Sequence, residues 1–183
     1  MSPRYRERMR IALVLVAACG GSQVAHVPPP SADSRPPSVS LPAVSDALDA
    51  CRQHTLEVLN GYRAQAGVTP LVLDPNLTAF AQEGSKRYAR DQQPHAHMRE
   101  QGRPMFRGRY RHENQGPKVG VPLDQTNLVE SCKERITDLT ARFMEKGPGE
   151  GHHDAVLDPR HHLLGVGLYV ENNLMWITND FME

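Results

Sequence analysis

The sequence lacks a long apolar run, a surplus of charge of either sign and any internal repeat. The apolar run over residues 11–18 falls far short of the roughly 20 residues that a membrane-spanning helix needs. The chain carries 21 Lys and Arg against 21 Asp and Glu, and residues 1–18 hold four of the Arg and one of the Glu. Beyond residue 18, 17 basic and 20 acidic residues therefore remain. We expect no basic face for nucleic acid.

Cysteine is scarce, with three residues in the chain, and the first follows an export signal. Residues 1–18 place four Arg before a short apolar run, as in a secretory signal peptide. Val16–Ala17–Ala18 before Cys19 is similar to the lipobox of bacterial lipoproteins, although Leu is usual where Val16 stands. We expect Cys19 to be lipidated; an ordinary cleaved signal with an incidental cysteine is the alternative. Gly20, where Asp would favour the inner membrane, favours an outer-membrane anchor.

Residues 19–43 are rich in Pro and Ser and poor in large apolar side chains. Such a segment cannot bury enough surface to fold, so we interpret it as an extended tether. Residues 44–183 are long enough for one domain with its own core. The chain is therefore expected to consist of a signal peptide over residues 1–18, a tether over residues 19–43 and a single domain.

Two cysteines remain once Cys19 is lipidated, namely Cys51 and Cys132. An even pair in an oxidising compartment favours a disulfide. Both cysteines lie on the apolar stripes of predicted helices, which makes their contact plausible. Two separate buried thiols are the alternative, since free cysteine is often buried.

Apolar residues at three- and four-residue steps predict helices over residues 45–66, 74–91 and 124–146, with a short helix over 151–158. Asp74–Pro75 is a strong helix start. Residues 70–73 should be extended, and strands over 163–170 and 174–181 should form a hairpin. Residues 92–123 are rich in Gly and Pro and are expected to form a long functional loop. Helices followed by strands favour an α+β fold with helices on an antiparallel sheet.

An ordered set of short motifs resembles the CAP superfamily, which comprises cysteine-rich secretory proteins, antigen 5 and pathogenesis-related proteins. The likeness is greatest to the bacterial secreted members and covers about residues 47–183. The motifs, in chain order, are Leu59–Arg63, Gly67–Asp74, Leu77 with Ala81, His97, Glu113–Asn114, Gly151–His152, Val156–Pro159, Gly165–Gly167 and the aromatic-ended last strand.

The resemblance implies an α-β-α sandwich with a central antiparallel sheet and a cleft lined by two His and two Glu. By position, His97, Glu113 and His152 match three members of this tetrad. Glu145 and Glu150 are the candidates for the second glutamate, and Glu145 is preferred.

The chain departs from the family pattern in two places. His112 stands where Gly usually precedes Glu-Asn. The interval between His97 and Glu113 is short, which leaves His95 as a rival for the first histidine.

The resemblance also implies that the cleft can bind zinc or another divalent metal, with His97 and His152 as ligands. A metal-bound water would then be acidified and could act as a nucleophile. Without metal, Glu113 could orient one histidine while the other acts as a general base. A polar cleft without chemistry is the third alternative. No nucleophile is evident, because Ser85 and Ser131 lie in predicted helices without a Gly-flanked turn.

Other polar and aromatic residues of these motifs have structural interpretations. Neighbouring residues on a helix do not share a face, so at most one histidine of each adjacent pair should point into the site. We expect His153, His161 and His162 to be solvated. Asn114 is expected to brace a loop, and Trp176 to be buried.

The sequence thus predicts an envelope-anchored CAP-like domain that binds a lipid, a cell-wall fragment or a divalent metal. The alternative is a hydrolase that uses the His/Glu cleft with or without metal, and whether the chain is an enzyme stays open. We expect a monomer that contacts the membrane through its lipid anchor and has no nucleic-acid partner.

Overall fold

The computed structural model describes residues 41–183, with side chains from Val44 onward. The predicted signal peptide, Cys19 and residues 19–40 of the predicted tether lie outside the described residues. The first helix begins at Leu41, four residues before the predicted start and inside the span predicted as tether. Within residues 41–183, no helix has both the length and the apolar composition that crossing a membrane requires.

The described part of the chain contains five α-helices, a short strand, a long strand and a C-terminal β-hairpin. The helices are α1 (Leu41–Gln65), α2 (Pro75–Asp91), α3 (Arg103–Met105), α4 (Leu128–Glu145) and α5 (Gly151–Leu157), with a π-helical turn η1 (Met98–Gly102) and a 3-10 turn η2 (Gln125–Asn127). The strands are β1 (Val72–Leu73), β2 (Arg111–Pro122), β3 (Leu163–Glu171) and β4 (Leu174–Met182).

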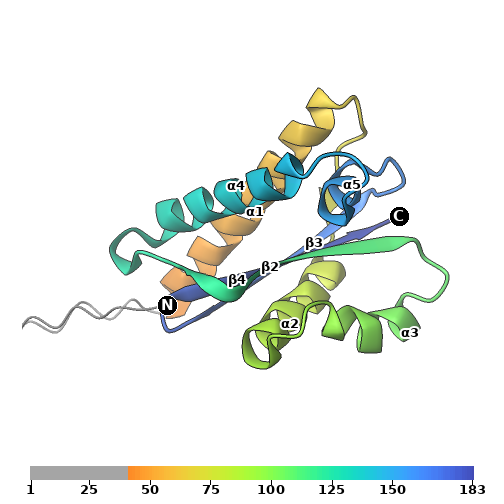
Figure 1. The fold of residues 1–183 in the computed structure, drawn as a ribbon. Coiled ribbons are helices and arrows are strands. Elements are labelled where there is room, and N and C mark those ends of the chain that lie inside the picture. The colour runs from red at the N-terminus through yellow and green to blue at the C-terminus, as the bar shows by residue number, and fades with distance from the viewer. Residues whose placement is uncertain (1–40) are drawn as a thin grey trace, which may run out of the picture. The chain divides into compact units, whose positions relative to one another are not determined.

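One four-stranded sheet, in the order β1-β3-β4-β2, lies between two layers of helices (Figure 1). β3, β4 and β2 pair antiparallel, while β1 adds a short parallel pair at the edge. Helix α2 packs on one face of the sheet, and α1, α4 and α5 cover the other (Figure 1). This arrangement confirms the predicted α+β fold and the α-β-α sandwich.

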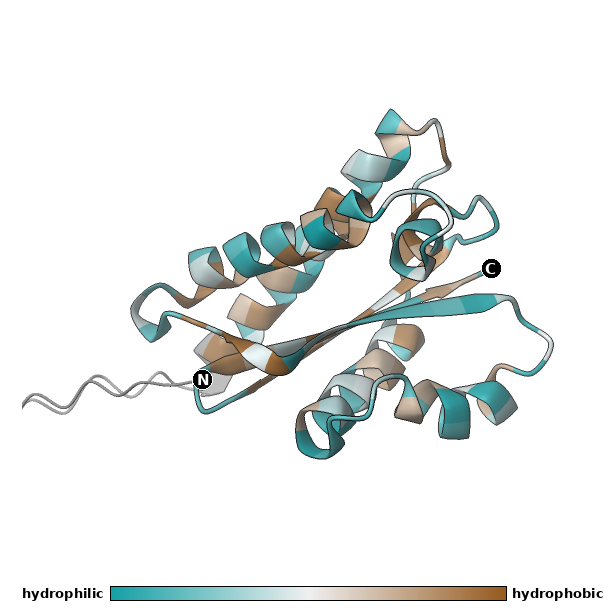
Figure 2. Ribbon diagram, viewed as in Figure 1, coloured by the Kyte–Doolittle hydropathy of each residue, from teal (hydrophilic) through white to brown (hydrophobic). Residues whose placement is uncertain are grey.

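The larger core lies between the sheet and the layer formed by α1, α4 and α5. Leu59 of α1, Ile136 of α4 and Val166 of β3 are buried there. Figure 2 shows that α1 and α4 carry their apolar residues along faces turned toward the sheet. Cys51 and Cys132 form a disulfide between these helices, with their Cα atoms 6.2 Å apart, which confirms the predicted pair.

On the other face, α2 lies unusually close to β3. A Cβ atom added at Gly167 would overlap the main-chain carbonyl of Ala81, and one at Gly165 would overlap that of Leu77. The Ser85 hydroxyl donates to the Gly167 carbonyl at 2.9 Å. The two glycines therefore allow the helix backbone to contact the strand directly.

The prediction of a long loop over residues 92–123 was wrong. This segment contains η1, α3 and the 12-residue strand β2. β2 pairs with β4 from Arg111 opposite Met182 to Gly116 opposite Ile177, and the register shifts before pairing resumes at Val121. Gly and Pro in the shifted part obscured the strand in the sequence, because these residues are depleted in strands.

Candidate functional site

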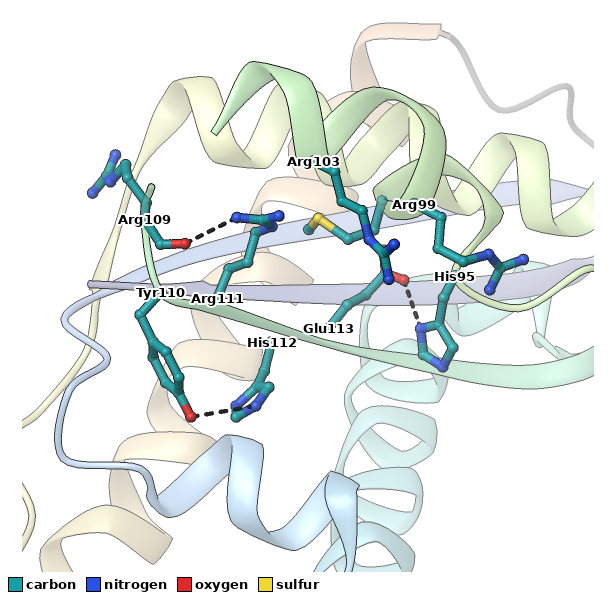
Figure 3. A pocket seen from close by; sticks show the side chains of 9 residues that line it. His95, Arg99, Arg103, Arg109, Tyr110, Arg111, His112 and Glu113 are labelled. Carbon is teal, nitrogen blue, oxygen red and sulfur yellow. Dashed lines mark hydrogen bonds and ion pairs between the residues drawn. The ribbon is translucent and has the colours of Figure 1, made fainter. Parts of the chain in front are cut away.

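Two of the residues predicted to form a cleft, Glu113 and His152, meet at the edge strand β2, where two cavities adjoin. Their volumes are about 390 Å³ and about 270 Å³. Both are lined by His95, His112 and Glu113. Figure 3 shows the larger cavity, and the first half of β2 that borders it is hydrophilic in Figure 2. We call the two cavities together the edge cleft.

Alternating side chains of β2 contact the helical layers on both faces of the sheet. Glu113 bonds His95, and Gln115 bonds the main chain of the α2 layer. Asn114, between them, is buried and donates to the His152 carbonyl of α5 at 3.0 Å. Successive strand residues point to opposite faces. The edge cleft is therefore formed where His95 from one layer and His152 from the other approach across the edge strand.

His95 is held in an unusual backbone conformation by two residues of β2. Its φ angle is +60°, which a residue with a side chain rarely adopts. The His95 amide donates to Gln115 Oε1 at 2.7 Å, and its Nδ1 lies 2.7 Å from Glu113 Oε1 (Figure 3). With Glu113 as a carboxylate, Nδ1 carries the proton and Nε2 is left free. Strained backbone of this kind concentrates at functional sites.

Glu113 belongs to a buried pair of carboxyl groups. Its side chain is 3% exposed, and it stands directly opposite Asp180 of β4. Burial, followed by the neighbouring Glu113 carboxylate, raises the pKa of Asp180 well above its ordinary value. Two buried carboxylates cannot both ionise at short range, so the pair retains a proton on Asp180. Both carboxyl oxygens of Asp180 and Oε2 of Glu113 are buried without a hydrogen-bond partner.

His152 forms the opposite wall of the edge cleft. It lies in the first turn of α5, and its ring packs on Phe143 at 4.5 Å between centroids. Burial lowers the pKa of His152, and the nearby Lys146 and His95 lower it further. The imidazole is therefore neutral at pH 7 and available as a hydrogen-bond partner. Lys146 and Glu150 line the same cavity.

The structure places the predicted tetrad as follows. Glu113 and His152 line the edge cleft, together with the rivals His95 and Glu150. His97 packs instead against Phe80 of α2, with ring centroids 4.3 Å apart, and does not line either cavity. Burial lowers the pKa of His97. Glu145, at the end of α4, is exposed and lines neither cavity.

Four arginines at the other end of the edge cleft were missed in the sequence. Arg99, Arg103, Arg109 and Arg111 line the larger cavity beside His95 and Glu113 (Figure 3). Among the described residues, none of the four forms an ion pair with a carboxylate side chain. The signal in the sequence was the density of arginine between residues 99 and 111. We call this part of the cleft the arginine end.

A second cluster of ligating side chains lies where β2 meets the end of α5 and the segment before β3. His112, Asp158 and His161 bring one ligand atom each within 4.8 Å of one another, and they could hold a metal ion. This is the one such group of three found among the described residues, and it includes neither His95 nor His152. His161 is fully buried, which corrects the prediction that it is solvated. His162 is exposed, and Trp176 is buried as predicted.

Comparison with known proteins agrees with this fold. The family model described as "CAP: Cysteine-rich secretory protein family" matches residues 56–179, more than half of the chain. The chain belongs to the CAP family. CAP domains are typically secreted or extracellular proteins. No curated protein matches the sequence.

Two bacterial proteins share the CAP fold at low sequence identity. An extracellular SCP-domain protein from Bacillus anthracis is 15% identical, with a TM-score of 0.52 over 80% of this chain and 45% of that one. A cysteine-rich secretory protein from Staphylococcus aureus is 17% identical, with a TM-score of 0.50 over 74% of this chain and 38% of that one. This chain thus spans less than half the length of either relative. At these identities the likeness concerns the fold.

Proposed function

We propose that this CAP domain is an envelope-anchored binding module whose edge cleft holds an anionic group of a small ligand. The observation that carries the proposal is the arginine end, where four arginines line a cavity whose one carboxylate residue is Glu113. That glutamate is already engaged by His95. The larger cavity therefore carries more positive than negative side chains, which favours a phosphate or a carboxylate as ligand.

Three of the four arginines donate to main-chain oxygens, Arg109 to that of Glu183. Arg99 donates to the Pro94 carbonyl at 2.8 Å, and Arg111 donates to the carbonyls of Phe106 and Arg109. Carbonyl oxygens orient a guanidinium group but leave its charge available. Donors fixed in this way lose little side-chain entropy when an anion binds.

The histidine end of the cleft supplies the remaining contacts of the ligand. His95 Nε2 can accept a hydrogen bond, the neutral His152 ring can accept or donate one, and Lys146 adds a further positive charge. A ligand that combines an anionic group with hydroxyl or amide groups fits both ends. Cell-wall fragments and lipid headgroups share this chemistry.

A hydrolase is the second candidate because Glu113 and His95 form a pair suited to general-base catalysis. Glu113 orients His95, and the free Nε2 could accept a proton from water. No Ser, Thr or Cys lines the two cavities of the edge cleft, so water would have to be the nucleophile. The one group of three ligand atoms found among the described residues shares only His112 with the edge cleft, so His95 and His152 do not belong to a three-ligand zinc site.

The predicted lipoprotein signal supports the placement in the envelope. Cys19 would carry the lipid, and residues 20–40 would separate the membrane from the folded domain. We propose the outer membrane as the location and a monomer as the functional state.

The experiment that tests the binding proposal is calorimetric titration of the purified protein with charged and uncharged probes. The charged probes are inorganic phosphate, glycerol phosphate as a lipid headgroup, and a muropeptide carrying carboxylates. Glycerol and an uncharged chitin disaccharide are the controls. Saturable binding of one or more charged probes, without binding of the controls, is expected. Binding of the uncharged sugar as tightly as of the muropeptide would contradict the proposal.

A further inference from the structure

We infer that His112, Asp158 and His161 form a divalent-metal site of the zinc type beside the anion-binding edge cleft, with His112 bordering both, and that Arg160 covers this site. The three residues come from β2, the C-terminal cap of α5 and the turn before β3. Their ligand atoms lie within 4.8 Å of one another. Two imidazoles and one carboxylate are a ligand set that zinc accepts.

The tautomer of His161 is fixed in the form that ligates a metal. Its Nδ1 lies 2.9 Å from the Ala155 carbonyl, which can only accept, so Nδ1 carries the proton. A metal ion binds the neutral ring. Nε2 therefore holds a bare lone pair. It is buried and has no hydrogen-bond partner. Metal-binding histidines commonly donate their second nitrogen to a carbonyl in this way.

His112 presents a second buried nitrogen without a partner. Its Nδ1 is buried and unpaired, while its Nε2 lies 3.5 Å from the Tyr110 hydroxyl. Tyr110 already donates to Asp158 Oδ2 at 2.8 Å, so its oxygen is left to accept from His112 Nε2. The bare nitrogen of His112 is then Nδ1. Its ring centroid lies 5.0 Å from that of His161. Two adjacent, buried acceptors without a donor are costly, and a cation would satisfy both.

The main chain that carries Asp158 and His161 is fixed before any ion binds. The buried Arg63 side chain donates to the carbonyls of Val156 and Asp158 at 2.6 and 3.1 Å, and to that of His161 at 2.8 Å. Metal–ligand bonds of about 2 Å place the donors of one ion roughly 3.5 Å apart. The three side chains thus need to close by roughly an ångström, without a rearrangement of their backbone.

Arg160 occupies the remaining side of the cluster. It donates to Asp158 Oδ2 at 2.7 Å and to Oδ1 at 3.0 Å, and its guanidinium lies 3.4 Å from the centre of the Tyr110 ring. Its charge neutralises Asp158 when no ion is bound. A divalent ion competes with Arg160 for this carboxylate, so removal of the guanidinium should increase metal affinity. Arg160 is exposed and can swing toward solvent.

The experiment is Zn²⁺ titration of the EDTA-treated full chain by calorimetry, with Co²⁺ absorption to report the coordination geometry. The wild type is expected to bind one Zn²⁺. His112→Ala and His161→Gln should each weaken binding at least tenfold, as expected on loss of a ligand. Arg160→Gln should strengthen binding. The exposed neighbour variant His162→Ala and the cleft variant His152→Ala should bind like the wild type.

Three outcomes would overturn the inference. The first is a wild-type chain that binds no Zn²⁺. The second is unchanged affinity in His112→Ala, a partly exposed position where substitution leaves the buried His161 in place. The third is weaker binding in Arg160→Gln. Loss of binding in His152→Ala alone would move the metal to the edge cleft. Anion binding by the arginine end is measured separately and does not depend on any of these results.

Discussion

Glu113 and Asp180 stand directly opposite each other on β2 and β4, and their carboxyl groups are buried, which favours the protonated form of Asp180. The folded pKa of Asp180 is raised above its unfolded value, so the folded state holds a proton that the unfolded state releases. The free energy of unfolding that this proton contributes is fully present below about pH 3.9, the unfolded value. It is lost as the pH rises toward the folded pKa.

Asp180→Asn should remove this dependence, because the amide has nearly the shape of the protonated acid and does not ionise. The free energy of unfolding of Asp180→Asn relative to wild type should increase with pH above about 4, with a slope of up to about 1.4 kcal/mol per pH unit. Urea denaturation of both proteins between pH 4 and 8 measures it. Parallel pH profiles would show that Asp180 ionises normally.

The contact between α2 and β3 predicts a large difference between two glycine substitutions. Gly167→Ala should lower the free energy of unfolding by about 2 kcal/mol or more, because the new methyl group overlaps the Ala81 carbonyl. Gly61→Ala is the matched control: Gly61 is exposed within α1, and an added Cβ meets nothing within 4 Å. It should stabilise the helix by about 0.5–1 kcal/mol. Equal thermal stabilities of the two variants would argue against direct packing of helix on strand.

The lipoprotein proposal predicts that Cys19 decides where the protein is found. Cys19→Ser should leave the precursor unprocessed or release the protein from the membrane fraction. Fractionation and mass spectrometry of the mature N-terminus measure this. The control is Cys51→Ser, a cysteine substitution outside the signal, which should leave the membrane fractionation unchanged. A Cys19→Ser protein that is cleaved and fractionates like wild type would reject lipidation.

The sequence predicted those parts of the fold that follow from one periodic pattern. The apolar stripes through Leu59 and Ile136 predicted the long helices α1 and α4. Because Cys51 and Cys132 lie on the same stripes, the pattern also predicted their disulfide. β2 was not predicted, because Gly116 and Gly120 interrupt it and its pairing with β4 shifts between Gly116 and Val121. Its ladder depends on β4, more than 50 residues later in the chain.

The sequence predicted only part of the site, because the rest also depends on contacts between distant segments. Sequence position could not separate His95 from His97, since the choice depends on the positive φ of His95 that turns its ring toward Glu113. The arginine end depends on how η1, α3 and the start of β2 fold back on one another, which no local pattern encodes. His161 is buried by contacts with Ala155 and Phe181 rather than by its own residue type.

The affinity of inorganic phosphate for matched arginine variants tests the central claim most directly. Arg99→Gln/Arg103→Gln removes two guanidinium groups from the edge cleft, whereas Arg107→Gln/Arg142→Gln removes two exposed ones that do not line it. Both doubles change the net charge equally. Loss of a hydrogen bond to a charged group costs about 1.5–3 kcal/mol, so the first double should bind phosphate at least tenfold more weakly than wild type. The second double should bind like wild type. Equal phosphate affinities of the two doubles would contradict an anion-binding edge cleft.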